Sequence, residues 1–199
     1  TTTLGISHLP FTVKGANSLA GLSEINASHL ELENLSFPYC VSINSLFINE
    51  ESTGNTYNTA DITVTLAHEL GHYLGLHHVF SETENENSCE DTDYCADTPT
   101  YNKKAYDMDC AYIEVNDPDN FTFANLVNRE NCLTGESFVS YNIMDYAISY
   151  SDRFTPEQRA RIRHVLLYSP LIPGPKAGQE AGTRSAPSGL MKLPIRTAK

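Results

Sequence analysis

The sequence predicts an α+β domain that has a mixed sheet and a long helix above a cleft, and a loop-rich lower subdomain ending in a second helix. Three observations support this fold class. Residues 1–50 alternate short apolar stretches with Gly, Pro, Asn and Ser, as strands and loops do. A helical apolar period follows at 62–74, and a helical pattern with Pro in its first turn occupies 155–168.

Length and composition favour one domain. The chain has 199 residues and is 40% hydrophobic, which is enough for one sizeable core. We expect the domain over residues 1–168 and a Pro- and Gly-rich tail or linker over 169–199. The net charge of -12 argues against nucleic acid or an anionic membrane as a partner, and no apolar run approaches a membrane span.

Two apolar stretches are expected to form strands, Leu4–Leu9 and Tyr39–Ile48. Cys40 lies in the second stretch and is expected to be a buried free thiol. Asp107–Glu136 is polar and lacks clear periodicity, so we expect an irregular insertion near the cleft.

The first helix has a start signal and an apolar face. Thr59 or Asp61 can cap its N-terminus. An apolar stripe that recurs every four residues is expected to face the core: Ile62, Leu66, Leu70 and Leu74. His68 and His72 fall roughly opposite this stripe, so the helix is expected to show them to a cleft.

This helix also begins the pattern H-E-x-x-H-x-x-G-x-x-H. His68 and His72 lie one helical turn apart, so both imidazoles can bind one metal ion. Glu69 lies beside them and can act as a base on a water in the open fourth position of a zinc ion. The segment therefore indicates a catalytic zinc site.

The third zinc ligand is expected just after the helix. Gly75 can adopt the backbone conformation with which the chain leaves the helix and returns toward the metal. The G-x-x-H spacing selects His78, and His77 is its rival.

A second element, Asn142–Tyr146, lies downstream. Together with the zinc motif it resembles the Met-turn of the metzincin metallopeptidases, in which a methionine forms a hydrophobic floor under the histidines. Met144 occupies that position. Tyr146 matches a position that in several metzincin families stabilises the tetrahedral intermediate.

The combination of the zinc motif with Asp93–Pro99, Asn142–Tyr146 and Phe154–Gln158 resembles the pappalysin (cytophagalysin) family over about residues 60–165. The resemblance implies a metzincin-like catalytic domain. It also implies a secreted enzyme that cleaves a protein or peptide substrate and binds zinc and structural calcium.

The acidic run Glu82–Asp97 is a candidate calcium site. It contains seven carboxylates and no Lys or Arg, and its oxygen ligands suit calcium, although such runs are usually solvated loops. The family's calcium ligands map onto the side chains of Asp93, Asp97 and Thr98 and the carbonyl of Cys95.

Four of the five cysteines lie between the zinc motif and the Met-turn: Cys89, Cys95, Cys110 and Cys132. Two disulfides would stabilise this segment in an oxidising compartment, and the spacing does not choose among three connectivities. The resemblance favours Cys89 with Cys132 and Cys95 with Cys110. A second metal site is the alternative, although no C-x-x-C pair supports it.

The resemblance also implies strands and a backing helix ahead of Leu4–Pro10, and no signal-peptide pattern is present at Thr1. Three explanations stay open. Those elements belong to a separate fragment, the sequence is incomplete, or the upper subdomain is built differently. An N-terminal fragment or propeptide is therefore a candidate partner.

The substrate pocket is expected to differ from that of relatives that select a basic residue after the scissile bond. Those relatives place an aspartate shortly after the Met-turn, where this chain has Ser149. A hydroxyl cannot replace that charge, so we expect a relaxed preference. Asp152 would add a basic bias only if it turned inward.

The sequence thus predicts a zinc-dependent endopeptidase. The alternative from another class is a catalytically silent binding module that keeps the fold and the zinc. The presence of Glu69 argues against it, because a structural zinc site needs no base. A small-substrate zinc hydrolase on another fold is disfavoured by the third histidine and the Met-turn.

Overall fold

The computed structural model describes residues 3–26, 39–53, 58–145, 147–172 and 176–177, and it combines helices with small sheets. The strands are β1 (Gly5–Ser7), β2 (Thr12–Val13), β3 (Glu24–Ile25), β4 (Val41–Ile43), β5 (Asn128–Glu130) and β6 (Ser137–Val139). The helices are η3 (Ser45–Phe47), α1 (Ile62–Tyr73), α2 (Lys103–Asn116), η4 (Pro118–Asn120), α3 (Phe123–Leu126) and α4 (Pro156–Tyr168). None of these helices is long and apolar enough to cross a membrane.

The described strands form three separate pairs instead of the single mixed sheet that was expected. β1 pairs antiparallel with β4, β2 parallel with β3, and β5 antiparallel with β6. Local sequence explains the short strands. Pro10 closely follows β1 and has no N–H to donate. Gly15 and Gly21 have φ of +136° and +81°, so the chain turns between β2 and β3.

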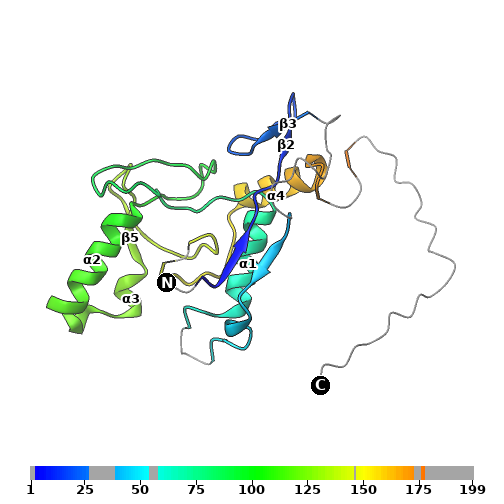
Figure 1. Cartoon of the computed structure of the whole chain (residues 1–199). Helices are drawn as coiled ribbons and strands as arrows, with labels where there is room; N and C mark the ends of the chain where they lie inside the picture. The colour runs from blue at the N-terminus through cyan, green and yellow to red at the C-terminus, as the bar shows by residue number, and fades with distance from the viewer. Residues whose placement is uncertain (1–2, 27–38, 54–57, 146, 173–175, 178–199) are drawn as a thin grey trace, which may run out of the picture.

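Helix α1 lies at the centre of the fold, with β1 and β4 packed beside it (Figure 1). The predicted start is confirmed at Asp61, whose carboxylate accepts hydrogen bonds from the N–H groups of Thr63 and Val64. The helix ends at Tyr73, and the chain turns at Gly75 into the loop that carries His78.

The apolar stripe of α1 does not face the core as predicted. Leu66 and Leu70 are 42% and 41% exposed, whereas Thr65 and Glu69 on the neighbouring face of the helix are buried. The face that packs against the β1–β4 pair therefore carries small and polar side chains. The two ends of the stripe, Ile62 and Leu74, are partly buried, and Leu74 packs against a core cluster of Leu22, Val165 and Ile172.

Helix α4 confirms the predicted C-terminal helix. Thr155 caps it in a reciprocal hydrogen-bonded arrangement with Gln158, and Pro156 occupies the first position. The buried Arg161 donates from Nε to the Gly75 carbonyl at 2.5 Å, which fixes α4 to the end of α1. Packing continues past α4, because Ile172 is buried in the core.

The region 107–136 is not irregular, as was expected. It contains most of α2, followed by η4, α3 and β5, and these elements lie together to one side of α1 (Figure 1). Asn102 caps α2 through its side chain. No residue of α2 is buried, and its apolar side chains Met108, Tyr112 and Val115 are exposed.

Candidate metal centre

Three histidine side chains converge between α1 and the loop after it. His68 and His72 come from α1, and His78 comes from the loop. The Nε2 atom of His72 lies 3.1 Å from the Nε2 atoms of both His68 and His78. Ligands of a tetrahedral zinc ion at 2.0–2.1 Å lie roughly 3.3 Å apart, so these atoms are spaced as a zinc site requires.

Each histidine is oriented through its other ring nitrogen. The Nδ1 atom of His68 contacts the Ile143 carbonyl at 2.7 Å, and that of His72 contacts the Leu76 carbonyl at 2.8 Å. Since a carbonyl only accepts, these Nδ1 atoms carry hydrogen and leave Nε2 free to bind a metal. The Nδ1 atom of His78 contacts the Glu82 carboxylate instead.

Burial keeps the two helical histidines neutral. Burial, and then the neighbouring His72 and His78, lowers the pKa of His68 to about 3. Burial, and then His78, lowers the pKa of His72 to about 4. Both imidazoles are therefore unprotonated at neutral pH, which is the form that binds a metal.

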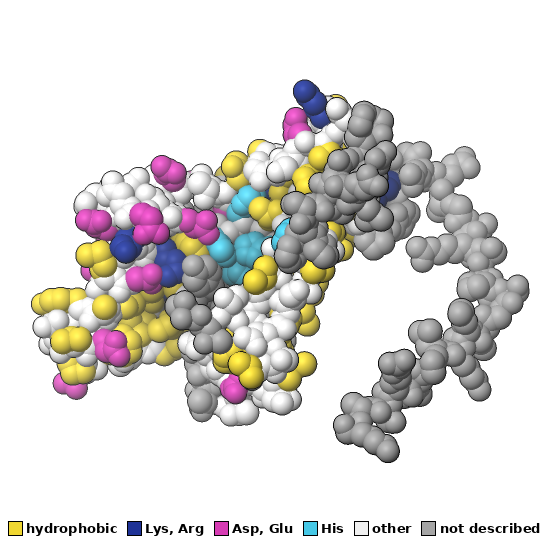
Figure 2. Space-filling model, viewed as in Figure 1, with side chains coloured by type: hydrophobic (Ala, Val, Ile, Leu, Met, Phe, Trp, Pro, Cys, Tyr) yellow, Lys and Arg dark blue, Asp and Glu magenta, His cyan; other side chains and the backbone are white. Residues whose placement is uncertain are grey.

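The donor set fits zinc. It consists of three imidazoles on one side of a recess, and imidazole nitrogen is a ligand that zinc prefers. In Figure 2 the histidine side chains gather in the hollowed centre of the visible face. A cavity of about 240 Å³ opens there, lined by histidines and Glu82 from one side and by Ser7 and Leu9 from the other.

Glu69 lies next to this cluster and is 8% exposed. Burial raises its pKa above the usual range of a glutamate. The backbone of β1 presses on this side chain, since a methyl group on Gly5 would lie 2.7 Å from the Glu69 Cγ atom. The absence of a side chain at Gly5 therefore leaves room for the carboxylate, a role that the sequence patterns did not indicate.

Two residues shape the site from below and behind. Gly75 has a φ of +89°, and a methyl group on it would lie 2.7 Å from a Val165 methyl. Met144 is fully buried against Leu76 and Val79, below the histidines. The rival ligand His77 lines the same cavity but is not part of the converging triad, and its ring packs against Tyr94 at a centroid distance of 5.3 Å.

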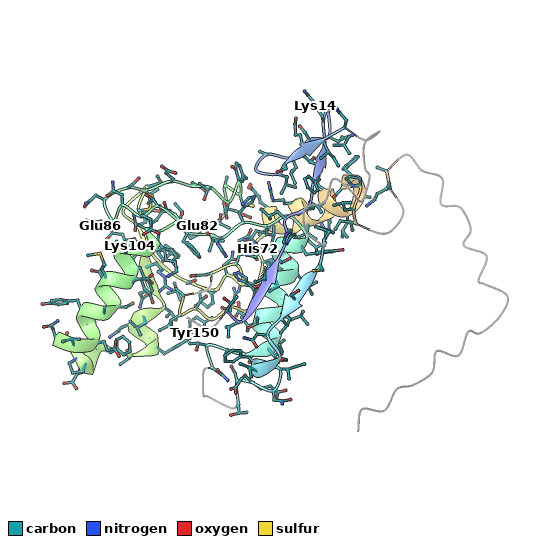
Figure 3. The ribbon with its side chains drawn as sticks, viewed as in Figure 1. Lys14, His72, Glu82, Glu86, Lys104 and Tyr150 are labelled. Atoms are coloured by element: carbon teal, nitrogen blue, oxygen red, sulfur yellow. A yellow bond between two sulfur atoms is a disulfide. The ribbon has the colours of Figure 1, made fainter. Side chains whose placement is uncertain are left out.

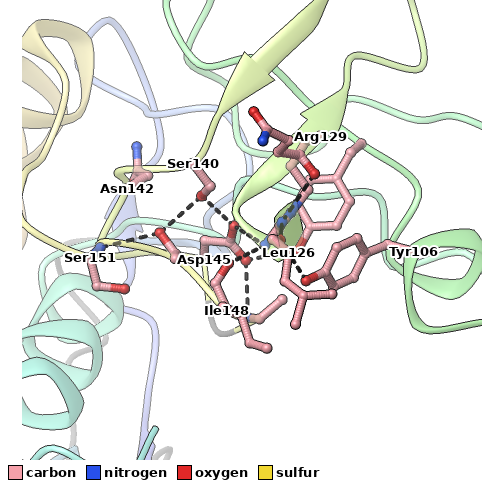
Figure 4. Close-up of polar contacts among 12 residues, drawn as sticks. Tyr106, Leu126, Arg129, Ser140, Asn142, Asp145, Ile148 and Ser151 are labelled. Atoms are coloured by element: carbon pink, nitrogen blue, oxygen red, sulfur yellow. Dashed lines mark hydrogen bonds and ion pairs between the residues drawn. The ribbon is translucent and has the colours of Figure 1, made fainter. Parts of the chain in front are cut away.

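Asp145, which follows Met144 in the chain, belongs to a buried polar cluster that the sequence did not predict (Figure 4). The side chains of Arg129 and Asp145 are both fully buried, with Nη2 and Oδ2 3.5 Å apart. Arg129 also donates to the Ile148 carbonyl at 2.5 Å. Asp145 accepts hydrogen bonds from the hydroxyls of Tyr101 and Ser140 at 2.8 and 2.6 Å. The cluster therefore fixes the chain directly after Met144.

The two specificity candidates do not offer a free charge to a pocket. Ser149 is fully buried, and its hydroxyl lies 2.9 Å from that of Ser140 within the polar cluster. Asp152 pairs with Arg153 through two hydrogen bonds of 2.6 and 3.0 Å at the surface. Tyr146, the candidate for stabilising the intermediate, lies outside the described residues.

Three oxygen atoms of the candidate calcium site converge. The Thr98 hydroxyl lies 2.6 Å from both the Asp93 carboxylate and the Cys95 carbonyl. Burial raises the pKa of Asp93 to about 7, because the hydrogen bonds to its carboxylate do not offset the loss of solvation of the charge. Asp97 is engaged elsewhere and accepts a hydrogen bond from the Glu157 N–H at the start of α4.

One of the two favoured disulfides is present, between Cys89 and Cys132. The other is not formed, because Cys95 and Cys110 are free thiols on different elements. Cys95 lies in the loop against α4, and Cys110 lies on α2. The third free thiol in the described residues, Cys40, is half-buried, not fully buried as expected.

Sequence comparisons indicate relatives. The model of the peptidase M43 family, described as pregnancy-associated plasma protein-A, matches residues 40–167. Extracellular metalloproteases of Arthroderma benhamiae and Trichophyton verrucosum are each 36% identical over 99 residues, which are 49% of this chain and 29% of the relative. That of Arthroderma otae is 35% identical over 99 residues. The matched segment thus spans less than a third of each relative, and no solved structure matches the chain.

Proposed function

This chain belongs to the M43 peptidases, the pappalysin family, and from that membership we propose that it is a zinc-dependent endopeptidase with a metzincin catalytic domain. One observation supports the proposal above all others. The Nε2 atom of His72 lies 3.1 Å from the Nε2 atoms of both His68 and His78. The Nδ1 atom of each histidine contacts a hydrogen-bond acceptor. A set of imidazoles oriented in this way is suited to a metal ion.

The residues of the chain have distinct roles in this proposal. Zinc, when bound by the three histidines, supplies Lewis acidity and lowers the pKa of a water molecule. Glu69 accepts the proton of the attacking water and donates it to the leaving amine. Its burial suits this role, because a raised pKa makes a carboxylate a better proton acceptor near neutral pH. Tyr146 stabilises the oxyanion.

The catalytically silent alternative is not favoured. A module that only stored zinc would gain nothing from a buried carboxylate beside the ligands, since that carboxylate is costly to desolvate. Glu69 is nevertheless buried there, next to His68 in the chain, and a recess lined by His72 and His78 opens at the same cluster.

Several finer features complete the proposal. The substrate is a polypeptide, and the protein acts outside the cell, as its relatives do according to their name, extracellular metalloprotease. A structural calcium ion binds to the side chains of Asp93 and Thr98 and to the Cys95 carbonyl. Asp97 is the fourth candidate ligand of this loop. Selection after the scissile bond is relaxed, because Ser149 is neutral and the Asp152 carboxylate is paired with Arg153.

Cleavage of a mixed peptide library tests the proposal. The purified chain should cleave internal bonds, should lose activity on removal of zinc with a chelator, and should regain it on addition of zinc. The products should show a varied residue after the cut. Activity that persists in the metal-free protein would contradict the proposal.

A further inference from the structure

The third histidine of the triad differs from the other two in what holds it. His68 and His72 are oriented by backbone carbonyls of Ile143 and Leu76, whereas His78 is oriented by the carboxylate of Glu82. One histidine of the triad, His78, therefore contacts a negatively charged side chain, the Glu82 carboxylate. This charge lies behind the ligand that comes from a loop, not from α1.

We propose that Glu82 is a positioning residue of the metal centre, which fixes the His78 imidazole and strengthens it as a ligand. The inference rests on the proposed zinc site and deepens it. A carboxylate that accepts a hydrogen bond from a metal-bound histidine fixes the orientation of the ring and makes its other nitrogen a better electron donor.

The surroundings of His78 explain why such a partner matters. Its ring stacks on Phe80, with centroids 4.7 Å apart and planes 12° apart. Stacking fixes the plane of the ring but not its direction within that plane. The Glu82 contact supplies the missing restraint, since it fixes where Nδ1 points and therefore where Nε2 points.

Glu82 is held in place by its neighbour in the chain. Ser81 is fully buried, and its N–H donates to the Tyr101 carbonyl at 2.8 Å. The Ser81 hydroxyl accepts from the Glu90 N–H at 3.1 Å. The residue before Glu82 is thus fixed to Tyr101 and Glu90, which positions the backbone of Glu82, while the Glu82 side chain is 61% exposed.

Other carboxylates of the same loop do not share this position. Figure 3 labels Glu82 and His72 near the centre of the molecule, and Glu86 further out along the loop near Lys104. The Glu86 carboxylate accepts a hydrogen bond from Asn87 and is exposed. It provides a matched control, because its conversion to glutamine changes the net charge equally.

The test compares zinc binding by the purified full chain and its variants E82A, E82Q and E86Q. Zinc dissociation constants come from competition with a chromophoric chelator, and cobalt substitution reports the geometry through the visible absorption bands. We expect E82A to bind zinc about 10–100-fold more weakly than the wild type. E82Q should lose less, because its amide oxygen still accepts from Nδ1, and E86Q should stay within about twofold.

Metal-free melting temperatures separate positioning from folding. The metal-free forms of E82A and E82Q should melt like the wild type, and the cobalt bands should shift in E82A but not in E86Q. Equal zinc affinity of E82A and E86Q would overturn the inference and leave the proposed function intact. If E82A failed to fold, E82Q would decide in the same way. A wild type that binds no zinc would contradict the proposed function itself.

Discussion

Gly71 and Met144 are in such close contact that a methyl group added to the glycine would lie 2.3 Å from the methionine sulfur. Gly71 is on α1, between the two helical histidines, and Met144 lies on the turn below them. The helix and the turn can approach this closely only because residue 71 has no side chain. The same contact places Met144 under the proposed zinc ligands.

We predict that G71A destabilises the protein and weakens zinc binding. Helix propensity alone would make this change stabilising by about 0.5–1 kcal/mol, because alanine favours a helix more than glycine does. Overpacking against Met144 acts in the opposite direction and typically costs 1–3 kcal/mol. Urea unfolding measures the balance, with L70A at an exposed position of the same helix as control. A G71A protein as stable as the wild type would contradict the close contact between Gly71 and Met144.

The buried pair of Arg129 and Asp145 gives a second prediction. R129M should lower the free energy of unfolding by roughly 3–5 kcal/mol, because it leaves the Asp145 carboxylate buried without its counter-charge. The exposed pair of Arg153 and Asp152 is a matched control, for which R153M should cost about 0–1 kcal/mol. Denaturant unfolding measures both variants. Equal losses would contradict the assignment of a structural role to the buried pair.

The elements that could be predicted from the sequence are those with local signals. Helix α4 has Thr155, Pro156 and Gln158 at its start, and these three residues define a capped helix without tertiary information. The spacing of the zinc motif likewise depends on one helix and one turn. It therefore brought His68 and His78 into one predicted site.

Other features depend on contacts between distant segments and left no local signal. Arg129 lies on β5 and Asp145 in the turn after β6, and nothing in the sequence near either residue marks the other as its partner. In the sequence, nothing distinguishes Glu82 from the other carboxylates of the acidic run, and only the fold of the loop places it against His78. Leu66 and Leu70 form a helical stripe, but β1 packs on the neighbouring face at Glu69, and both leucines are exposed.

The cap of α1 gives a prediction about pH. Burial raises the pKa of Asp61, but hydrogen bonds from Ser52, Val64 and Thr63 outweigh it and hold the pKa below its usual value. A lowered pKa stabilises the fold above the unfolded value of about 4, and this contribution is lost as the pH falls through the folded value. The difference in stability between wild type and D61A should therefore be about 1 kcal/mol at pH 7. It should shrink in urea titrations as the pH falls below about 4.

The proposed calcium site gives a prediction about metal removal. A calcium-selective chelator should lower the melting temperature and increase proteolysis within residues 82–135, because the buried Asp93 carboxylate loses its counter-ion. D93N should melt at the same temperature with and without calcium. An unchanged wild-type melting temperature at matched zinc occupancy would count against calcium at this loop.

The most direct test of the central claim is the turnover of E69Q on a peptide that the wild type cleaves, measured at equal zinc content. Glutamine keeps the shape of the side chain beside the intact histidine triad but cannot accept the proton. Both proteins should bind one zinc per chain, and E69Q should lose about 10²–10⁴-fold in activity. An E69Q protein that loads zinc normally and keeps more than about a tenth of the wild-type turnover would contradict the role of Glu69 as the base.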